Sequence, residues 1–176
     1  MTEEQTNGDS LVGMAAKKTK AKAKAKVVAK KTKTKAKVVA KKTKKPAGAG
    51  AIVQEVRFAA RPSRVFDAYL DAKSHAAFTG APARIDATPG VAFSVWDGYI
   101  TGTNLEIERP GRIVQAWRTT EFPDEHADSR LELLLTPDGT GTLLRLVQTG
   151  LPVDQVASYE QGWHDHYWSP MREFLG

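Results

Sequence analysis

The first patterned part of the chain changes from a strand period to a helical period. The run Ile-Val-Gln-Glu-Val-Arg-Phe at 52–58 is rich in β-branched and aromatic residues, which predicts a first strand. Pro62 or Ser63 then supplies a helix start signal. Four apolar residues follow at helical spacing: Val65, Phe66, Tyr69 and Leu70. A second short helix is predicted over 74–78, ended by Gly80.

Short β-type runs then alternate with turn signals. The turn signals are Pro89-Gly90, Asp97-Gly98, Pro110-Gly111, Pro123-Asp124 and Pro137-Asp138-Gly139. The clearest runs between them are 113–117, 131–135 and 143–147. Asp-Gly between such runs is a strong hairpin signal. Because the spacing leaves no room for crossover helices, we expect six strands here, in an antiparallel, meandering sheet.

Polar residues within these runs indicate which face of each strand is buried. The residues that should point outward are Arg112, Arg118, Arg130, Glu132 and Arg145. Because side chains alternate between the two faces of a strand, their neighbours should point inward. The inward set is Ile113, Gln115, Trp117, Leu131, Leu133, Leu135, Leu144, Leu146 and Gln148.

The C-terminal segment returns to a helical period. Its apolar stripe at three-to-four spacing consists of Val156, Tyr159, Trp163, Tyr167, Met171 and Phe174. Pro170 interrupts this stripe and should kink the helix or loosen its final turn. The predicted order is one strand, two helices, six strands and one long helix. This order predicts an α+β fold in which the long helix covers the concave face of the sheet.

Charge divides the chain at about residue 50. Residues 1–50 carry 15 Lys against three acidic residues, a net charge of +12, whereas residues 51–176 carry 11 basic and 17 acidic side chains, a net charge of −6. The N-terminal part has almost no large apolar residue, so it cannot offset its chain entropy by burial. We expect residues 1–50 to be a disordered, Lys/Ala-rich tail whose last residues, 46–50, act as a flexible linker.

The remaining residues, 51–176, suffice for one domain with a single core. The chain has no cysteine, which excludes disulfides and thiolate metal sites and fits a reducing compartment. Its N-terminus lacks the apolar run of a secretory signal, and no stretch approaches the ~20 apolar residues of a membrane span. We therefore expect a cytoplasmic protein.

Several motifs, in this order, resemble one known family. They are Phe-Thr-Gly-Ala-Pro-Ala at 78–83 with Gly90 and Phe93, Asp-Gly-Tyr-Ile-Thr-Gly at 97–102 with Asn-Leu-Glu at 104–106, Arg-Ile-Val-Gln-Ala-Trp-Arg at 112–118 with Phe122-Pro123, and Gly162-Trp163 with Tyr167-Trp168. Together they resemble the AHSA-type family, homologues of the C-terminal domain of the heat shock protein 90 ATPase activator, in the START/Bet v 1-like (SRPBCC) superfamily. The resemblance covers about residues 52–175.

The resemblance implies a helix-grip fold, in which a seven-stranded antiparallel sheet wraps around a C-terminal helix, often with an apolar cavity between them. It also implies a chaperone as a candidate partner. In the eukaryotic activators a separate N-terminal domain engages the chaperone; here a lysine-rich segment stands in its place.

The inward-facing residues have two interpretations. They line a ligand cavity, or they fill a fully packed core. The candidate cavity residues are Phe93, Gln115, Trp117, Leu133, Leu146, Gln148, Trp163 and Tyr167. Aromatic residues would fill a packed core equally well. Gln115 and Gln148 favour the cavity, because buried amides need partners that a ligand or water could supply.

The sequence gives little support for a catalytic site or a metal site. On a helix, His164 and His166 lie about 200° apart, so they predict a polar helix flank and no metal site. Asp97 is expected in a hairpin turn. An enzyme, such as a cyclase or hydrolase of the kind found among helix-grip relatives, would need Asp97, Glu106 or Asp165 in the cavity. We expect no catalytic residue, metal or cofactor.

The tail is a candidate for non-specific polyanion binding. Its lysines are Lys17, Lys18, Lys20, Lys22, Lys24, Lys26, Lys30, Lys31, Lys33, Lys35, Lys37, Lys41, Lys42, Lys44 and Lys45. The segment resembles linker-histone tails and the lysine/alanine-repeat proteins of bacterial nucleoids. Ammonium groups contact phosphates without reading bases, so DNA or another polyanion would be bound regardless of sequence, with nucleoid or chromatin association. The alternative is a tail that only solubilises the protein.

Three functions therefore remain open. The first is a non-enzymatic binding protein that holds a small apolar ligand or a protein partner and is tethered by its tail. The second is a co-chaperone for a 90-kDa heat shock protein. The third is an enzyme that uses the helix-grip cavity.

Overall fold

The computed structural model describes residues 49–176, so the predicted disorder and polyanion binding of the lysine-rich tail lie outside the described residues. Seven strands form one antiparallel sheet in the order β1-β7-β6-β5-β4-β3-β2. The strands are β1 (Ala49–Phe58), β2 (Ala83–Arg84), β3 (Ala92–Val95), β4 (Ile100–Glu108), β5 (Arg112–Thr119), β6 (Ser129–Asp138) and β7 (Gly141–Pro152). This confirms the predicted seven strands and their antiparallel pairing.

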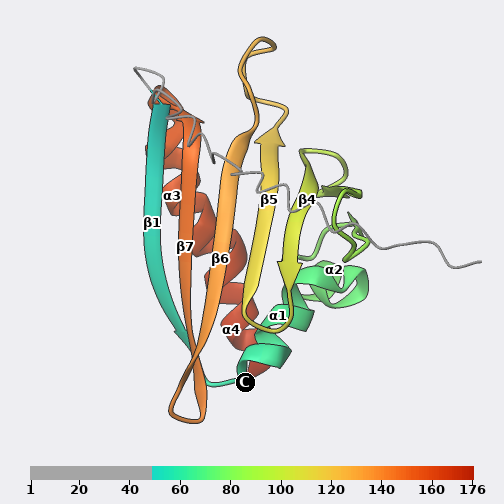
Figure 1. The fold of residues 1–176 in the computed structure, drawn as a ribbon, viewed down its shortest axis with the longest axis vertical. Coiled ribbons are helices and arrows are strands. Elements are labelled where there is room, and N and C mark those ends of the chain that lie inside the picture. Colours follow the sequence, from blue (N-terminus) through green and yellow to red (C-terminus); the bar gives the residue numbers. More distant parts are fainter. Residues whose placement is uncertain (1–48) are drawn as a thin grey trace, which may run out of the picture. The chain divides into compact units, whose positions relative to one another are not determined.

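The C-terminal helix crosses one face of this sheet (Figure 1). It begins as a 3₁₀ turn, η1 (Val153–Gln155), and continues as α3 (Val156–Trp163), a π-helical turn, η2 (His164–Trp168), and α4 (Ser169–Leu175). Two short helices, α1 (Pro62–Leu70) and α2 (Ala72–Thr79), follow β1. The α+β helix-grip architecture is thus confirmed.

The two short helices are joined at a single residue. Pro62 occupies the first turn of α1, where its missing N–H costs nothing, so Pro62 and not Ser63 marks the start. Asp71, in an extended conformation, ends α1 and is also the N-cap of α2, where its carboxylate accepts a hydrogen bond from Ser74 N at 2.8 Å. Gly80, with φ of 71°, ends α2 in the left-handed conformation that glycine adopts most easily.

The first strand begins earlier than the sequence pattern indicates. Ala49 and Gly50 were expected in a flexible linker, but they pair with Pro152 and Leu151 of β7. An added Cβ at Gly50 would lie 2.1 Å from Val156 Cγ2. At Gly50 the strand therefore passes close to the C-terminal helix, and Ala49 and Gly50 belong to β1 and not to a flexible linker.

The C-terminal helix loosens just before Pro170. Ser169 N donates to His164 O, five residues back, which is the hydrogen bond of a π turn. Pro170 has no N–H to continue the regular ladder. The turn that widens is the one before Pro170, whereas the final turn, which was predicted to loosen, is α-helical in α4. Phe174, the last member of the predicted stripe, is 41% exposed and is not part of the core.

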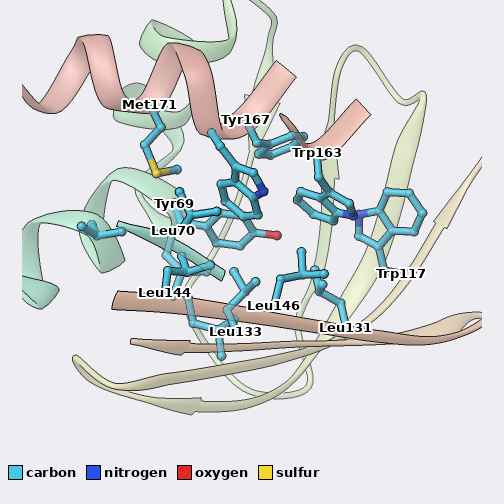
Figure 2. Packing of buried hydrophobic residues seen from close by; sticks show 14 of the residues in the cluster. Tyr69, Leu70, Trp117, Leu131, Leu133, Leu144, Leu146, Trp163, Tyr167 and Met171 are labelled. Carbon is cyan, nitrogen blue, oxygen red and sulfur yellow. The ribbon is translucent and has the colours of Figure 1, made fainter. Parts of the chain in front are cut away.

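The core lies between the sheet and the helices (Figure 2). All nine residues predicted to face inward on β5, β6 and β7 are at most 4% exposed. Leu131, Leu133, Leu144 and Leu146 rise from the strands toward Trp163, Tyr167 and Met171 of the helix, while Tyr69 and Leu70 come from α1. Burying each such leucine contributes about 1.5–3 kcal/mol. Among residues 49–176 no helix has the length and apolarity that crossing a bilayer requires.

Candidate functional site

A cleft of about 290 Å³ lies between the C-terminal helix and the β3–β5 part of the sheet. We call it the aromatic cleft. Its walls are Trp96, Tyr99, Ile100, Trp117, Thr119, Ser158, Tyr159, Gly162, Trp163, His166 and Tyr167. Six of these are Trp or Tyr, so the cleft offers flat, apolar surfaces with a few polar edges.

The β3–β4 turn supplies one wall. Trp96 and Asp97 have φ of 55° and 52°, and Gly98 has φ of 89°, so three consecutive residues adopt a left-handed conformation. This conformation is uncommon outside glycine. As a result the tight turn presents Trp96 and Tyr99 to the cleft. The predicted Asp97-Gly98 hairpin is confirmed.

The helix supplies the opposite wall. Tyr159, Gly162, Trp163 and His166 follow the spacing of one helical face. An added Cβ at Gly162 would meet only His166 Cδ2, at 4.0 Å. Glycine inside a helix costs about 0.5–1 kcal/mol relative to alanine, so Gly162 keeps this part of the wall open at a cost in stability.

Two polar side chains of the cleft wall, Tyr159 and Thr119, are held by hydrogen bonds. The Tyr159 hydroxyl lies 2.6 Å from Thr119 Oγ1 and donates to Gln155 Oε1 at 2.8 Å. Burial raises the pKa of Tyr159 to about 12, so the hydroxyl stays protonated at neutral pH. The tyrosine therefore presents a neutral ring to the cleft.

The two buried amides are satisfied by protein groups. Gln148 accepts from Trp163 Nε1 at 2.8 Å and donates to Ser129 Oγ at 2.9 Å. The Gln115 side chain accepts from the Tyr69 hydroxyl at 3.0 Å and donates to Asn104 Oδ1 at 2.7 Å. These amides therefore need no ligand or water as a partner, and the prediction that they favour a cavity for this reason was wrong. Their hydrogen bonds instead position Trp163 and Tyr69.

The sequence-predicted cavity residues divide into three groups. Trp117, Trp163 and Tyr167 line the aromatic cleft. Phe93 and Gln115, together with Trp117 and Tyr167, line a separate void of about 10 Å³, which we call the inner void. The residues that line neither space are Leu133, Leu146 and Gln148, which are fully buried.

Sequence reasoning missed several walls of the cleft. Trp96 was assigned no role, Tyr99 was noted only as part of the family motif at 97–102, and His166 was predicted to lie on a polar helix flank. Its ring lies 5.5 Å from that of Trp96. The helical spacing of Tyr159, Gly162, Trp163 and His166 was the signal that could have identified the helix wall.

The three carboxylates that an enzyme would need do not line the cleft. Glu106 pairs with Arg112, whose hydrogen bond lowers the carboxyl pKa. Asp165 is exposed, and hydrogen bonds from Gln161 and His164 lower its pKa. Asp97 remains in its turn. Within residues 49–176 no group of His, Asp and Glu gathers with the geometry to hold a metal ion.

These features define a class of protein: a helix-grip domain with an aromatic cleft between sheet and helix. Residues 59–176 match the family model described as Activator of Hsp90 ATPase homolog 1-like protein, and the chain belongs to this family. The predicted family is thereby confirmed.

The curated relatives are longer proteins. The human activator of 90 kDa heat shock protein ATPase homolog 1 is 27% identical over 172 residues, which cover 97% of this chain and 48% of the human protein. A Dictyostelium discoideum homologue with the corresponding name is 29% identical over 107 residues, covering 60% of this chain and 28% of that protein. The chain thus spans less than half the length of these relatives.

Solved structures share the fold. An HSP90 activator from Plasmodium falciparum superposes with a TM-score of 0.67 at 22% identity, over 72% of this chain and 96% of that one. CalU16 from Micromonospora echinospora gives a TM-score of 0.63 at 25% identity, over 73% of this chain and 77% of that one.

Proposed function

We propose that this domain binds a small, flat, apolar ligand in the aromatic cleft. The observation that supports it is a cleft of about 290 Å³ walled by six Trp and Tyr side chains, close to the lower end of the ~300–1,000 Å³ typical of ligand sites. Such rings favour offset or edge contacts with an aromatic guest. Gly162 supports the same proposal, because its missing side chain leaves room at a cost in helix stability.

Naphthalene is a suitable probe, because it is flat and carries no polar group. We would titrate it into the ¹⁵N-labelled full chain and follow the four tryptophan indole N–H signals. Saturable shifts of Trp96, Trp117 and Trp163 are expected. No saturable shift up to the solubility limit would contradict the proposal.

Gly162→Leu provides the matched test of location. The leucine side chain occupies the open space beside His166, so naphthalene affinity should fall at least about tenfold, the equivalent of 1.4 kcal/mol. Gly162→Ala is the control, since a single methyl group leaves most of the cleft free. Equal loss in both variants, or no loss in either, would place the ligand elsewhere.

A chaperone partner is the second candidate, and the names of the human and Dictyostelium relatives support it. We infer that the domain acts on a 90-kDa heat shock protein. The test is the ATPase rate of that purified chaperone with saturating full chain. An unchanged rate, with binding also absent by calorimetry, would exclude this role.

The tail carries a separate proposal, supported by its 15 lysines within residues 17–45. If about half of them pair with phosphates, the affinity for duplex DNA should fall with salt at a log–log slope of about −6. The control is the full chain with those lysines replaced by glutamine. Equal DNA binding by both proteins would show that the tail takes no part.

A further inference from the structure

His75 is a buried histidine with one unpartnered nitrogen. It lies in α2 and is 2% exposed. Its Nδ1 is 2.8 Å from the carbonyl oxygen of Tyr69. A carbonyl only accepts hydrogen bonds, so Nδ1 carries the proton and Nε2 is the acceptor of the neutral ring. Nε2 has no hydrogen-bond partner among residues 49–176.

The acceptor remains available at neutral pH. Burial lowers the pKa of His75 below its ordinary value of 6.5, so the ring is neutral there and keeps the Nε2 lone pair. The rings around it belong to Tyr69, Phe78 and Tyr167, with centroids 5.0–5.6 Å away. None of these side chains donates to Nε2. An unpaired buried acceptor costs free energy that a donor would recover.

His75 lines the inner void, and this space has the size of one small polar group. Its volume of about 10 Å³ is close to the smallest cavity that holds a water-sized group. Tyr69 and Gln115 also line it, and they already bond each other at 3.0 Å; the other lining side chains with a polar atom are Trp117 and Tyr167. Among the side chains that line the void, His75 supplies a buried acceptor, Nε2, that has no hydrogen-bond partner within residues 49–176.

The inner void and the aromatic cleft share two wall residues, Trp117 and Tyr167. We infer that the ligand is a hydroxylated aromatic molecule. Its flat body occupies the aromatic cleft, and its hydroxyl group reaches past Trp117 and Tyr167 into the inner void and donates a hydrogen bond to His75 Nε2. This inference rests on the proposed ligand-binding function and names the chemical class of the ligand.

Three probes with the same naphthalene ring distinguish the contribution of the hydroxyl group to affinity from that of the ring. They are 2-naphthol, which can donate, 2-methoxynaphthalene, which can only accept, and naphthalene, which can do neither. The full chain should bind 2-naphthol about tenfold more tightly than either other probe, because one buried hydrogen bond is gained and one unpaired acceptor is removed. The dissociation constants come from the same tryptophan N–H titration.

His75→Phe tests the acceptor. Phenylalanine keeps a flat ring at this position and removes Nε2, so the three probes should bind with equal affinity while naphthalene affinity is unchanged. The native chain gives an independent readout in case the variant does not fold. The ¹⁵N signal of His75 Nε2 should move when 2-naphthol is added and stay in place when 2-methoxynaphthalene is added.

The outcomes separate this inference from the proposed function. Naphthalene binding without any advantage for 2-naphthol would overturn the hydroxyl inference and leave the apolar cleft standing. A 2-naphthol advantage that persists in His75→Phe, with an unmoved Nε2 signal in the native chain, would also overturn it. Binding of none of the three probes would overturn both.

Discussion

The hydrogen bond between Trp163 and Gln148 should be the main polar contact that holds Trp163 in the helix wall of the aromatic cleft. Trp163 Nε1 donates to Gln148 Oε1 at 2.8 Å, and the two residues are 3% and 0% exposed. Gln148→Leu keeps a similar size and leaves the indole N–H without an acceptor. An unpaired buried donor costs about 1–3 kcal/mol. Ser129 Oγ loses one partner but keeps its own bond to the Trp117 carbonyl.

Trp163→Phe removes the donor itself. This variant also loses the stacking of Trp163 on Trp168, whose ring centroids are 5.4 Å apart at 14°, so its own cost includes packing. In the Trp163→Phe background, Gln148→Leu should leave the unfolding free energy nearly unchanged, because no indole N–H remains without an acceptor. The double-mutant cycle then isolates a coupling of about 1–3 kcal/mol.

The assay is urea unfolding followed by far-UV circular dichroism, since the fluorescence of the variants differs. A destabilisation of this size shifts the midpoint by about 1 M for a domain with a typical urea dependence. A coupling below about 0.3 kcal/mol would refute the reasoning, because the two side chains would then contribute independently. The hydrogen bond would in that case not hold Trp163 in the wall of the cleft.

Three further changes have definite expected outcomes. Gly162→Ala should raise the unfolding free energy by about 0.5–1 kcal/mol in urea titrations, since the added Cβ has space; a loss of stability would contradict this. Gly102→Ala should destabilise the domain by more than about 1 kcal/mol, because its Cβ would lie 2.0 Å from the Ala116 carbonyl oxygen; Gly139→Ala is a control in open space, strained only by its own φ of 60°. His75 has a lowered pKa in the folded state, so the unfolded chain binds more protons as pH falls below 6.5 and the unfolding free energy should decrease there. Urea titrations between pH 5 and 7.5 should show a shallower decrease for His75→Phe, and identical slopes would exclude His75 as the source.

The strands could be predicted because their signal is local. Arg130 and Glu132 mark the outward face of β6, and a period of two then assigns Leu131, Leu133 and Leu135 to the other face wherever the strand lies in the sheet. Their burial follows without knowledge of the partner strand. The burial of Tyr159, Trp163, Tyr167 and Met171 on one face of the helix could be predicted for the same reason, since the helical period is also local.

The cleft could be predicted only in part, because it depends on contacts between distant segments. Trp96 reaches the cleft through a turn in which Trp96 and Asp97, neither of them glycine, have positive φ. The residue types in this turn do not predict that conformation. Gln115 meets Asn104 because of the β4–β5 register, and it meets Tyr69 because α1 packs under the sheet. Such pairings satisfy the buried amides, and they cannot be read from a single strand.

Asp71 has a consequence for motion in the domain. One residue closes α1 and opens α2, and helices of nine and eight residues are too short to persist alone in water. We therefore expect α1 and α2 to unfold locally together. Loss of the Asp71–Ser74 hydrogen bond would release the segment that carries His75 and Phe78 from the core in one step. Local opening of α1 and α2, without global unfolding, would then expose the inner void, which Tyr69 and His75 line.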